Sequence, residues 1–228
     1  MKWRGLQTVD ASQSAATLKQ ELEERKVLAE QYVPAETQAI NRSTVDELNR
    51  SGIRERVLGI GAKAPSFELA DQDGKLISSK DLLSRGNLVI CFFRGRWCPF
   101  CVAQMEAMNQ ILPQLQQSGA GLVGISPQTV RQCSFMHDQL HLGFPLLSDK
   151  ANAVARQFGL VYRVPESQQE VYRKTFVNLP FLNGEASWEL PIPATYVLQQ
   201  DSTISYVQAD PDYARRPEPA EILEHTAG

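Results

Sequence analysis

The chain has few cysteines, no long hydrophobic run and no basic stripe, and each shortage excludes a class of protein. Four cysteines in 228 residues are too few for a disulfide-stabilised scaffold. The longest apolar runs, such as NLVICFF, have the length of a strand and are too short to span a bilayer. With a net charge of −3 and no basic segment, the chain does not resemble a nucleic-acid-binding protein.

The first residues, MKWRGLQTVDASQSAA, contain no apolar signal core, so we expect a cytoplasmic protein in a reducing compartment. In that setting a close pair of cysteines is more often catalytic or metal-binding than a static bridge. Hydrophobic residues make up 43% and charged residues 21%, so the composition is that of a soluble globular protein with an ordinary core. The length suits one domain with an appendage, or two very small domains.

The N-terminal part of the chain has the pattern of two helices. Residues 14–51 carry apolar side chains at helical spacing between charged ones, and Pro34 is expected to separate the two helices. Gly52 is predicted to close the second helix in the left-handed conformation. We therefore expect a helical extension over residues 1–55, which packs on the domain or on a second subunit, and one domain over residues 56–228.

The rest of the chain alternates strands and helices. LVICFFR is predicted to be a central strand covered on both faces, because polar residues do not alternate with apolar ones. Helices are predicted at about 99–117 and 129–141, a second buried strand in AGLVGISPQ, and a hairpin in PATYVLQQDSTISYVQAD. This order predicts an α/β sandwich with a central mixed β-sheet flanked by helices. Residues 161–190 are interpreted as an irregular insertion with some helix.

The stretch FFRGRWCPFC holds the most distinctive feature of the sequence, a CxxC pair formed by Cys98 and Cys101. Pro99 is suited to the first position of a helix, which would place Cys98 at the N-cap and Cys101 one turn inside. Unpaired backbone N–H groups and the helix dipole lower the pKa of a thiol there, and the thiolate is the reactive form. We prefer Cys98 as the attacking thiol, because the N-cap is the more exposed position and the better one for an anion.

The residues before the pair complete the candidate site. Arg94 and Arg96 would add positive potential near the sulfurs, and Trp97 would shield one side. A pair three residues apart on a first helical turn can form a disulfide with little backbone movement. If Cys98 attacks an oxidised substrate, Cys101 can then resolve the intermediate.

Two other readings of the pair stay open at this point. A zinc site could combine Cys98 and Cys101 with Cys133, His137 or His141, and the pair could also be inert packing. Its position between a buried strand and a helix begun by proline favours redox chemistry over both. Cys91 lies within the strand and is expected to be a small buried hydrophobe. Cys133 is interpreted as a surface or half-buried bystander, with a second resolving thiol as the alternative.

Several motifs in register resemble those of a known family. GAKAPSFELADQDGK, FFRGRWCPFC, GLVGISPQT, FPLLSD, LPIPATYVLQQDSTI and DYARRPEP are similar to the alkyl hydroperoxide reductase/thiol-specific antioxidant group of the thioredoxin-fold superfamily, and most closely to peroxiredoxin-like proteins with the motif FYRGxWCPYC. The resemblance covers roughly residues 58–223, and the N-terminal arm resembles an extension of the same subgroup. It implies a thioredoxin-like fold.

The resemblance also implies further site residues. In thioredoxin-like proteins a cis-proline loop faces the cysteine pair, so the Ile192–Pro193 bond is expected to be cis and to present backbone groups to substrate, together with Trp97 and Pro99.

The chain departs from the usual peroxiredoxin motif Pro-x-x-x-Thr-x-x-Cys. Arg94 replaces the proline, Cys98 replaces the threonine that holds the peroxide, and Cys101 takes the place of the cysteine that attacks it. The arginine that supports the thiolate in the family would fall near Pro193 and is missing there. Arg94 and Arg96 are candidates to replace it, as is Arg216, for which a salt bridge to Asp212 or Glu218 is the alternative role.

Three functions follow from these residues. The first is a thiol peroxidase that reduces a hydroperoxide, forms a Cys98–Cys101 disulfide and is recycled by thioredoxin or a glutaredoxin-type dithiol, with no prosthetic group. The second is a thiol–disulfide oxidoreductase acting on protein disulfides or glutathione disulfide. The third is a metal-binding or interaction module without turnover. We rank the peroxidase first, and the helical arm together with the family's habit suggests a homodimer without membrane or nucleic-acid partners.

Overall fold

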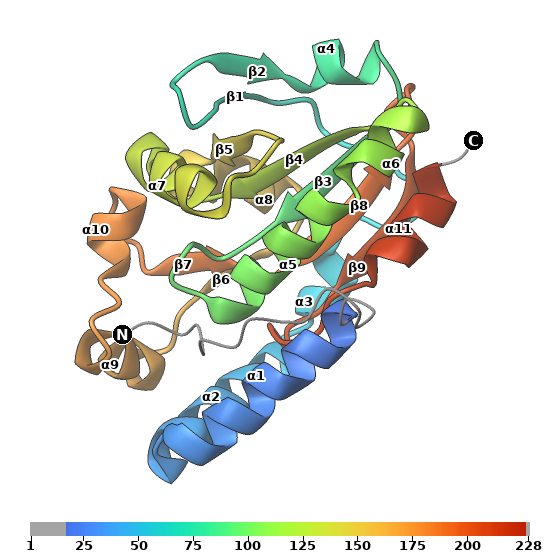
Figure 1. Ribbon diagram of the computed structural model, residues 1–228. Helices are drawn as coiled ribbons and strands as arrows, with labels where there is room; N and C mark the ends of the chain where they lie inside the picture. The colour runs from blue at the N-terminus through green and yellow to red at the C-terminus, as the bar shows by residue number, and fades with distance from the viewer. Residues whose placement is uncertain (1–16, 227–228) are drawn as a thin grey trace.

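The computed structural model describes residues 17–226, and its centre is a seven-stranded mixed sheet in the order β2-β1-β5-β4-β3-β8-β9 (Figure 1). The strands are β1 (Glu68–Ala70), β2 (Leu76–Ser78), β3 (Leu88–Phe92), β4 (Gly121–Ser126), β5 (Leu146–Ser148), β8 (Ala194–Leu198) and β9 (Ile204–Ala209). β3, β4 and β5 are parallel neighbours, whereas β8 runs antiparallel to both β3 and β9. The predicted α/β sandwich with a mixed sheet is confirmed.

β3 is the central strand that the sequence predicts. All five of its residues are buried, and its side chains alternate between two separate apolar cores. Val89 and Cys91 face one core, while Leu88, Ile90 and Phe92 face the other. A strand covered on both faces needs no polar alternation, which explains the unbroken apolar run.

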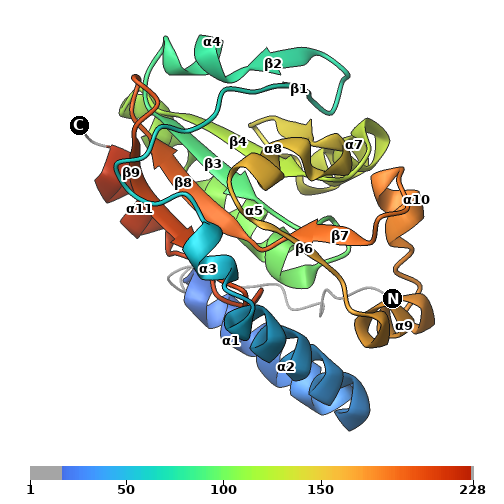
Figure 2. The same cartoon turned by 180° about the vertical axis from the view of Figure 1, so that it is seen from behind.

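Helices cover both faces of the sheet (Figures 1 and 2). The core on the first face includes side chains of α1 (Leu18–Tyr32), α5 (Pro99–Gln110), α6 (Leu112–Gln117), α7 (Val130–Leu140) and α11 (Pro219–Thr226). The core on the opposite face includes side chains of α2 (Ala35–Arg50), α3 (Ile53–Arg56), α4 (Ser79–Leu83) and α8 (Ala153–Gln157), which follows the short 3₁₀ turn η1 (Lys150–Asn152). Among residues 17–226 no helix is both long enough and apolar enough to cross a membrane.

The helix predicted over 99–117 is two helices in the structure, and this prediction was wrong in detail. α5 ends at Gln110, Ile111 leaves the helical conformation at φ −93° and ψ 0°, and α6 begins with Pro113 in its first turn. Proline lacks the N–H that would continue the first helix, and its ring clashes with the preceding turn. The sequence pattern stayed helical across the break because both halves bury the same face.

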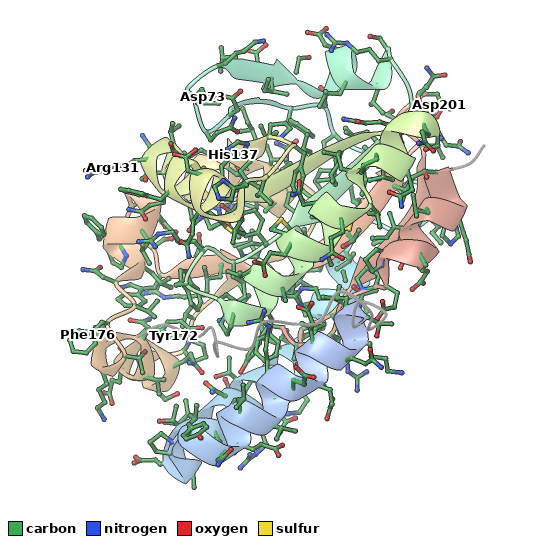
Figure 3. All side chains as sticks on the ribbon, in the orientation of Figure 1. Asp73, Arg131, His137, Tyr172, Phe176 and Asp201 are labelled. Carbon is green, nitrogen blue, oxygen red and sulfur yellow. The ribbon has the colours of Figure 1, made fainter. Side chains whose placement is uncertain are left out.

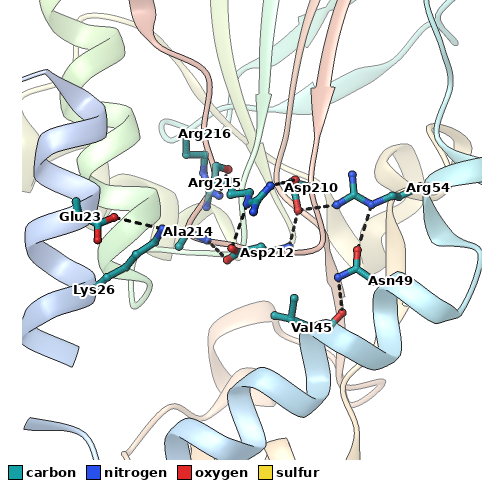
Figure 4. Close-up of polar contacts among 10 residues, drawn as sticks. All are labelled: Glu23, Lys26, Val45, Asn49, Arg54, Asp210, Asp212, Ala214, Arg215 and Arg216. Carbon is teal, nitrogen blue, oxygen red and sulfur yellow. Dashed lines mark hydrogen bonds and ion pairs between the residues drawn. The ribbon is translucent and has the colours of Figure 1, made fainter. Parts of the chain in front are cut away.

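The N-terminal arm follows its predicted outline. Pro34 separates α1 from α2, and Gly52 takes the left-handed conformation at φ 70°. Leu18 and Leu22 join the core beneath α5, so α1 is packed on the body of the protein. Arg54 ties the end of the arm to Asp210 by an ion pair at 3.0 Å (Figure 4). The division into an extension and a domain near residue 55 stays a prediction.

The insertion contains more order than the sequence indicates. It consists of α9 (Glu166–Lys174) and α10 (Leu179–Asn183), flanked by a two-stranded antiparallel sheet of β6 (Val161–Arg163) and β7 (Glu189–Pro191). α9 also packs against the arm, where the buried Thr44 hydroxyl donates to Gln168 Oε1 at 3.2 Å. The insertion therefore lies between the N-terminal arm and the loop that precedes α5.

The Ile192–Pro193 bond is trans, and the expectation of a cis bond was wrong, since no cis peptide bond occurs between residues 17 and 226. An X–Pro bond is intrinsically more stable in the trans form. Here the chain enters from β7 in extended form, and the Ile192 N–H donates to Leu160 O at 2.9 Å. This pairing carries the extended chain directly into β8 without a reversal at the proline.

Candidate active site

The helix entrance at the CxxC pair has the predicted geometry. α5 begins with Pro99, and Cys98 is its N-cap with extended backbone angles of φ −90° and ψ 113°. The Cys101 N–H donates to Cys98 O at 3.1 Å, which places the two cysteines on the same turn. The loop from β3 to α5 thus brings the pair to the carboxyl end of the central strand.

Both sulfurs are buried. Cys98 is 2% exposed and Cys101 is 0% exposed, and both are free thiols. The premise that Cys98 is the exposed cysteine was therefore wrong. Phe100 and Trp97 pack in the same core as the pair, which explains why an N-cap residue is covered here.

Cys101 is the sulfur that the surroundings stabilise as an anion. Burial alone would raise the pKa of the Cys101 thiol, but a hydrogen bond from the Cys98 thiol opposes it. The positive charges of Arg216 and Arg94, together with a backbone hydrogen bond from Arg94, then bring the pKa of Cys101 well below its usual value. Arg216 is in direct contact, with Nη2 at 3.6 Å from Cys101 Sγ.

Cys98 behaves in the opposite way. Burial raises the pKa of the Cys98 thiol well above its usual value, and its hydrogen bond to Cys101 and the charge of Cys101 raise it further. The surroundings therefore favour a negative charge on Cys101 over one on Cys98. Our sequence-based preference for Cys98 as the better stabilised anion is corrected by this arrangement.

Arg94 is a buried cation held by aromatic rings. Its side chain is 4% exposed, and its guanidinium carbon lies 4.7 Å from the ring centre of Trp97 and 4.4 Å from that of Tyr213. Arg94 Nη2 donates to the hydroxyl of Tyr172, a residue of α9 that Figure 3 labels at the lower edge of the insertion. Such contacts hold a guanidinium group in place while leaving its charge unneutralised.

Arg216 is held on Cys101 by a short polar chain. Its Nε donates to Gln104 Oε1 at 2.8 Å, and Gln104 Nε2 donates to the hydroxyl of Thr195 at 2.9 Å. Gln104 is 1% exposed and Thr195 is fully buried, so both groups depend on these bonds. Because a guanidinium group can only donate, the amide oxygen of Gln104 must face Arg216.

The salt bridge to Asp212 that was considered for Arg216 is formed by Arg215 instead. Arg215 Nε lies 3.5 Å from Asp212, and Arg216 forms no salt bridge within residues 17–226 (Figure 4). Arg216 is thus the member of this Arg-Arg sequence that is directed to the sulfurs. Arg216 contacts Cys101, whereas no arginine lies near Pro193 in the sequence.

Arg96 does not support the thiolate as predicted. Its side chain is exposed, its Nε donates to Gln132 Oε1 at 2.6 Å, and its guanidinium carbon lies 5.7 Å from the ring centre of Phe135. Both partners are on α7, because the chain turns at Gly95 before it enters α5. The guanidinium group therefore binds α7, while Arg94 is directed inward.

The residues predicted to contact substrate lie around the pair in different environments. Trp97 is half-buried against Tyr172, with ring centres 5.1 Å apart, and Pro99 is exposed at the start of α5. β8 begins with Ala194 opposite Phe92, so Pro193 and the buried Ile192 lie beside the end of β3. Their contact with a substrate stays a prediction.

The other two cysteines are structural. Cys91 is fully buried, as predicted, and burial raises the pKa of its thiol to about 12. Cys133 is also fully buried, on α7, so the expectation of a surface or half-buried residue was wrong. Burial raises the pKa of its thiol to about 12. No group of three or more His, Cys, Asp or Glu side chains suited to a metal ion occurs in the described part of the chain, so the residues considered for zinc do not converge.

Sequence reasoning missed three residues that shape the site, Gln104, Tyr172 and Tyr213. Gln104 lies three residues after Cys101 on α5, and this helical spacing was a signal that could have revealed it. The two tyrosines come from the insertion and from the loop after β9, and no local pattern connects them with the cysteines.

Known proteins resemble this chain in both sequence and fold. The model of the AhpC/TSA family matches residues 60–207. The thiol-disulfide oxidoreductase ResA of Bacillus thuringiensis is 29% identical over 109 residues, which are 47% of this chain and 62% of that protein. The putative peroxiredoxin bcp of Coxiella burnetii is 31% identical over 122 residues, covering 52% of this chain and 80% of that protein.

The fold is also similar to that of solved structures. The crystal structure of peroxidoxin BcpB from Mycobacterium tuberculosis superimposes with a TM-score of 0.59 at 22% identity, covering 74% of this chain and 96% of that one. The bacterioferritin comigratory protein of Xanthomonas campestris gives a TM-score of 0.55 at 17% identity, covering 69% of this chain and 88% of that one. At these identities the likeness shows a shared thioredoxin-like fold.

Proposed function

The chain belongs to the AhpC/TSA family, and from that premise we propose that it is a thiol peroxidase that reduces hydroperoxides through Cys101 and Cys98. The observation that supports this most directly is the contact of Arg216 with the buried Cys101 Sγ at 3.6 Å, in surroundings that lower the pKa of the Cys101 thiol. A thiolate is the nucleophile that peroxide reduction requires. No prosthetic group takes part.

In the first step Cys101 Sγ attacks one oxygen of the hydroperoxide. The O–O bond breaks and the attacked oxygen stays on sulfur, while its proton passes to the other oxygen, which leaves as alcohol or water; the cysteine is then a sulfenate. Arg216 and Arg94 are placed to stabilise the negative charge as it moves from sulfur to oxygen.

In the second step Cys98 resolves the intermediate. Its sulfur bonds to Cys101 Sγ, and the sulfenate oxygen takes up the Cys98 proton and leaves as hydroxide, which a proton from solvent converts to water. The Cys98 thiol already donates a hydrogen bond to Cys101, so the two sulfurs need little movement to join. Cys98 occupies the position of the threonine that usually holds the peroxide, and its S–H is a weaker donor.

The disulfide must be reduced from outside the chain. Burial raises the pKa of Cys91 and of Cys133 to about 12, so neither supplies the thiolate that exchange with the disulfide requires. We propose thioredoxin or a glutaredoxin-type dithiol as the reductant. A homodimer formed through the N-terminal arm is also part of this proposal.

A thiol–disulfide oxidoreductase is the second candidate function. The complete CxxC pair favours it, as does the similarity to ResA, although this chain spans 62% of the length of that relative. In that reaction a protein disulfide or glutathione disulfide would replace the hydroperoxide as the oxidant.

Stoichiometric oxidation followed by mass spectrometry tests the proposal. Reduced wild type, Cys98→Ser and Cys101→Ser would each be mixed with one equivalent of hydrogen peroxide and a sulfenic-acid trap at neutral pH. We expect the wild type to form the Cys98–Cys101 disulfide, Cys98→Ser to carry the trap on Cys101, and Cys101→Ser to remain unmodified. If Cys101→Ser carried the sulfenic-acid trap and Cys98→Ser did not, the attacking sulfur would be that of Cys98.

A parallel incubation with a model disulfide separates the two candidate functions. Rapid peroxide loss with slow disulfide exchange supports the peroxidase. The reverse result, with a wild type that peroxide does not oxidise, would replace it by the oxidoreductase.

A further inference from the structure

The site contains more positive charge than its protein surroundings neutralise. Arg94 is buried between two aromatic rings, and Arg216 is half-buried against Cys101. Neither arginine forms a salt bridge to a carboxylate within residues 17–226. Their hydrogen-bond partners are neutral: the Tyr172 hydroxyl for Arg94, and the Gln104 amide and the Arg215 carbonyl for Arg216.

The anion that faces both guanidinium groups is the Cys101 thiolate. A buried charge without a counter-charge is costly, so the thiolate and the two arginines stabilise one another in the reduced protein. Formation of the Cys98–Cys101 disulfide converts the thiolate into a neutral sulfur. The guanidinium groups then stay in place without their anion, because their aromatic and amide contacts do not depend on the cysteines.

We propose that the loss of this counter-charge makes the disulfide form the less stable form of the protein, so that the pair is readily reduced by a monothiol of the glutathione class. The inference rests on the Cys98–Cys101 disulfide of the proposed function. It adds the class of reductant, because a disulfide whose reduced form is stabilised has a high reduction potential. A weakly reducing thiol is then sufficient, and a strongly reducing dithiol protein is not required.

The direction of the exchange follows from the two sulfurs. A glutathione thiolate attacks Cys98 Sγ, and Cys101 leaves as the thiolate that Arg94 and Arg216 stabilise. A sulfur with a lower pKa is the better leaving group. A second glutathione thiolate then attacks the glutathione sulfur of the mixed disulfide, and Cys98 leaves and takes up a proton. One protein disulfide and two glutathiones thus give the reduced pair, with Cys101 ionised, one released proton and one glutathione disulfide.

A redox titration against glutathione tests the proposal without any hydroperoxide. The protein would be equilibrated in buffers of defined glutathione to glutathione-disulfide ratio and quenched with acid. Free thiols would then be alkylated, and mass spectrometry would give the fraction of reduced protein. We expect Arg216→Met to shift the equilibrium constant at least about tenfold toward the disulfide, since one pKa unit of thiolate stabilisation corresponds to tenfold. Arg215→Gln is the matched control, because its ion pairs point to Asp210 and Asp212, and we expect a change below about twofold.

Chemical unfolding gives a second and independent readout. A disulfide ordinarily stabilises a protein, but here we expect the oxidised wild type to unfold at a lower denaturant concentration than the reduced wild type. We expect the difference to shrink in Arg216→Met, and if that variant does not fold the wild-type comparison decides alone. An oxidised form as stable as the reduced one, or an Arg216→Met equilibrium equal to that of the wild type, would overturn the proposal. Failure of the peroxidase assay alone would leave it standing.

Discussion

Arg216 Nη2 lies 3.6 Å from Cys101 Sγ, although 115 positions separate the two residues in the sequence. The contact brings a charge from the loop before the last helix to the first turn of α5. Arg216 therefore contacts the sulfur, although the sequence places no arginine near Pro193. Together with Arg94, it lowers the pKa of the Cys101 thiol.

Replacing Gln104 with glutamate tests how Arg216 is held. Gln104→Glu keeps the shape of the side chain but places a carboxylate against Arg216, which would compete with the thiolate for its charge. We expect the pKa of Cys101 to rise by about one unit from about 5, so that its peroxide reaction slows about fivefold at pH ~5 and changes little at neutral pH. Stopped-flow kinetics between pH ~5 and ~8 would measure both effects.

Thr195→Val is the control for this variant. It removes the other hydrogen bond of Gln104 and leaves the contact between Gln104 and Arg216 intact. We expect a loss of stability of about 1–3 kcal/mol with little change in the pKa of Cys101. A wild-type pH profile in Gln104→Glu would show that Arg216 does not set the reactivity of Cys101.

The Tyr172 hydroxyl is expected to be important for stability because it accepts a hydrogen bond from the buried Arg94. Tyr172→Phe leaves a charged donor without that partner, and we expect a loss of about 1–3 kcal/mol in the free energy of unfolding. Urea unfolding measures it. Tyr32→Phe removes a hydroxyl from an exposed side chain and should change stability by less than about 0.5 kcal/mol. Equal stabilities of the two variants would remove the role assigned to Tyr172.

Gly159 fixes the junction between the arm and the sheet. A Cβ atom there would lie 1.9 Å from Arg56 O, and the residue has φ +74°. Gly61 has a similar φ of +86° but open space around it, so Gly61→Ala reports the backbone strain alone. We expect Gly61→Ala to lower the free energy of unfolding by about 1 kcal/mol, and Gly159→Ala to lower it by at least about 2 kcal/mol more. Equal losses in thermal or urea unfolding would show that the junction tolerates the added atom.

The stability of the reduced protein should increase with pH. The pKa of Cys101 is lower in the folded protein than in the unfolded chain, so between those two values the unfolded chain binds a proton that the folded protein does not. The stabilisation is therefore complete above the unfolded pKa of about 8.5 and is lost as the pH falls through the folded pKa. Urea unfolding of wild type and Cys101→Ser from about pH 6 to about pH 8.5 should show a difference that grows with pH. A difference in stability between wild type and Cys101→Ser that stays constant with pH would contradict a lowered pKa of Cys101.

The sequence predicted the features that depend on neighbouring residues. The buried strand β3 follows from an apolar run, and the N-cap position of Cys98 follows from Pro99 directly after it. The left-handed Gly52 likewise depends on a local signal. These elements place the cysteine pair correctly before any tertiary contact is known.

The features that the sequence missed depend on distant contacts. Arg96 is close to the pair in sequence, but its guanidinium group binds Gln132 on α7. Tyr172 reaches Arg94 from an insertion that carries no periodic signal. Exposure of Cys98 was expected from its N-cap position alone, whereas tertiary packing buries it. Local spacing therefore located the pair, and only the fold showed that Arg216 contacts Cys101.

The most direct test is a titration of the thiolate itself. The ultraviolet absorbance of thiolate would be followed with pH in reduced wild type, Cys98→Ser and Cys101→Ser. We predict that the wild type and Cys98→Ser keep one thiolate at neutral pH and that Cys101→Ser has none. A wild-type absorbance that first rises near or above pH ~8.5, as for an ordinary thiol, or a neutral-pH thiolate that persists in Cys101→Ser, would contradict the account.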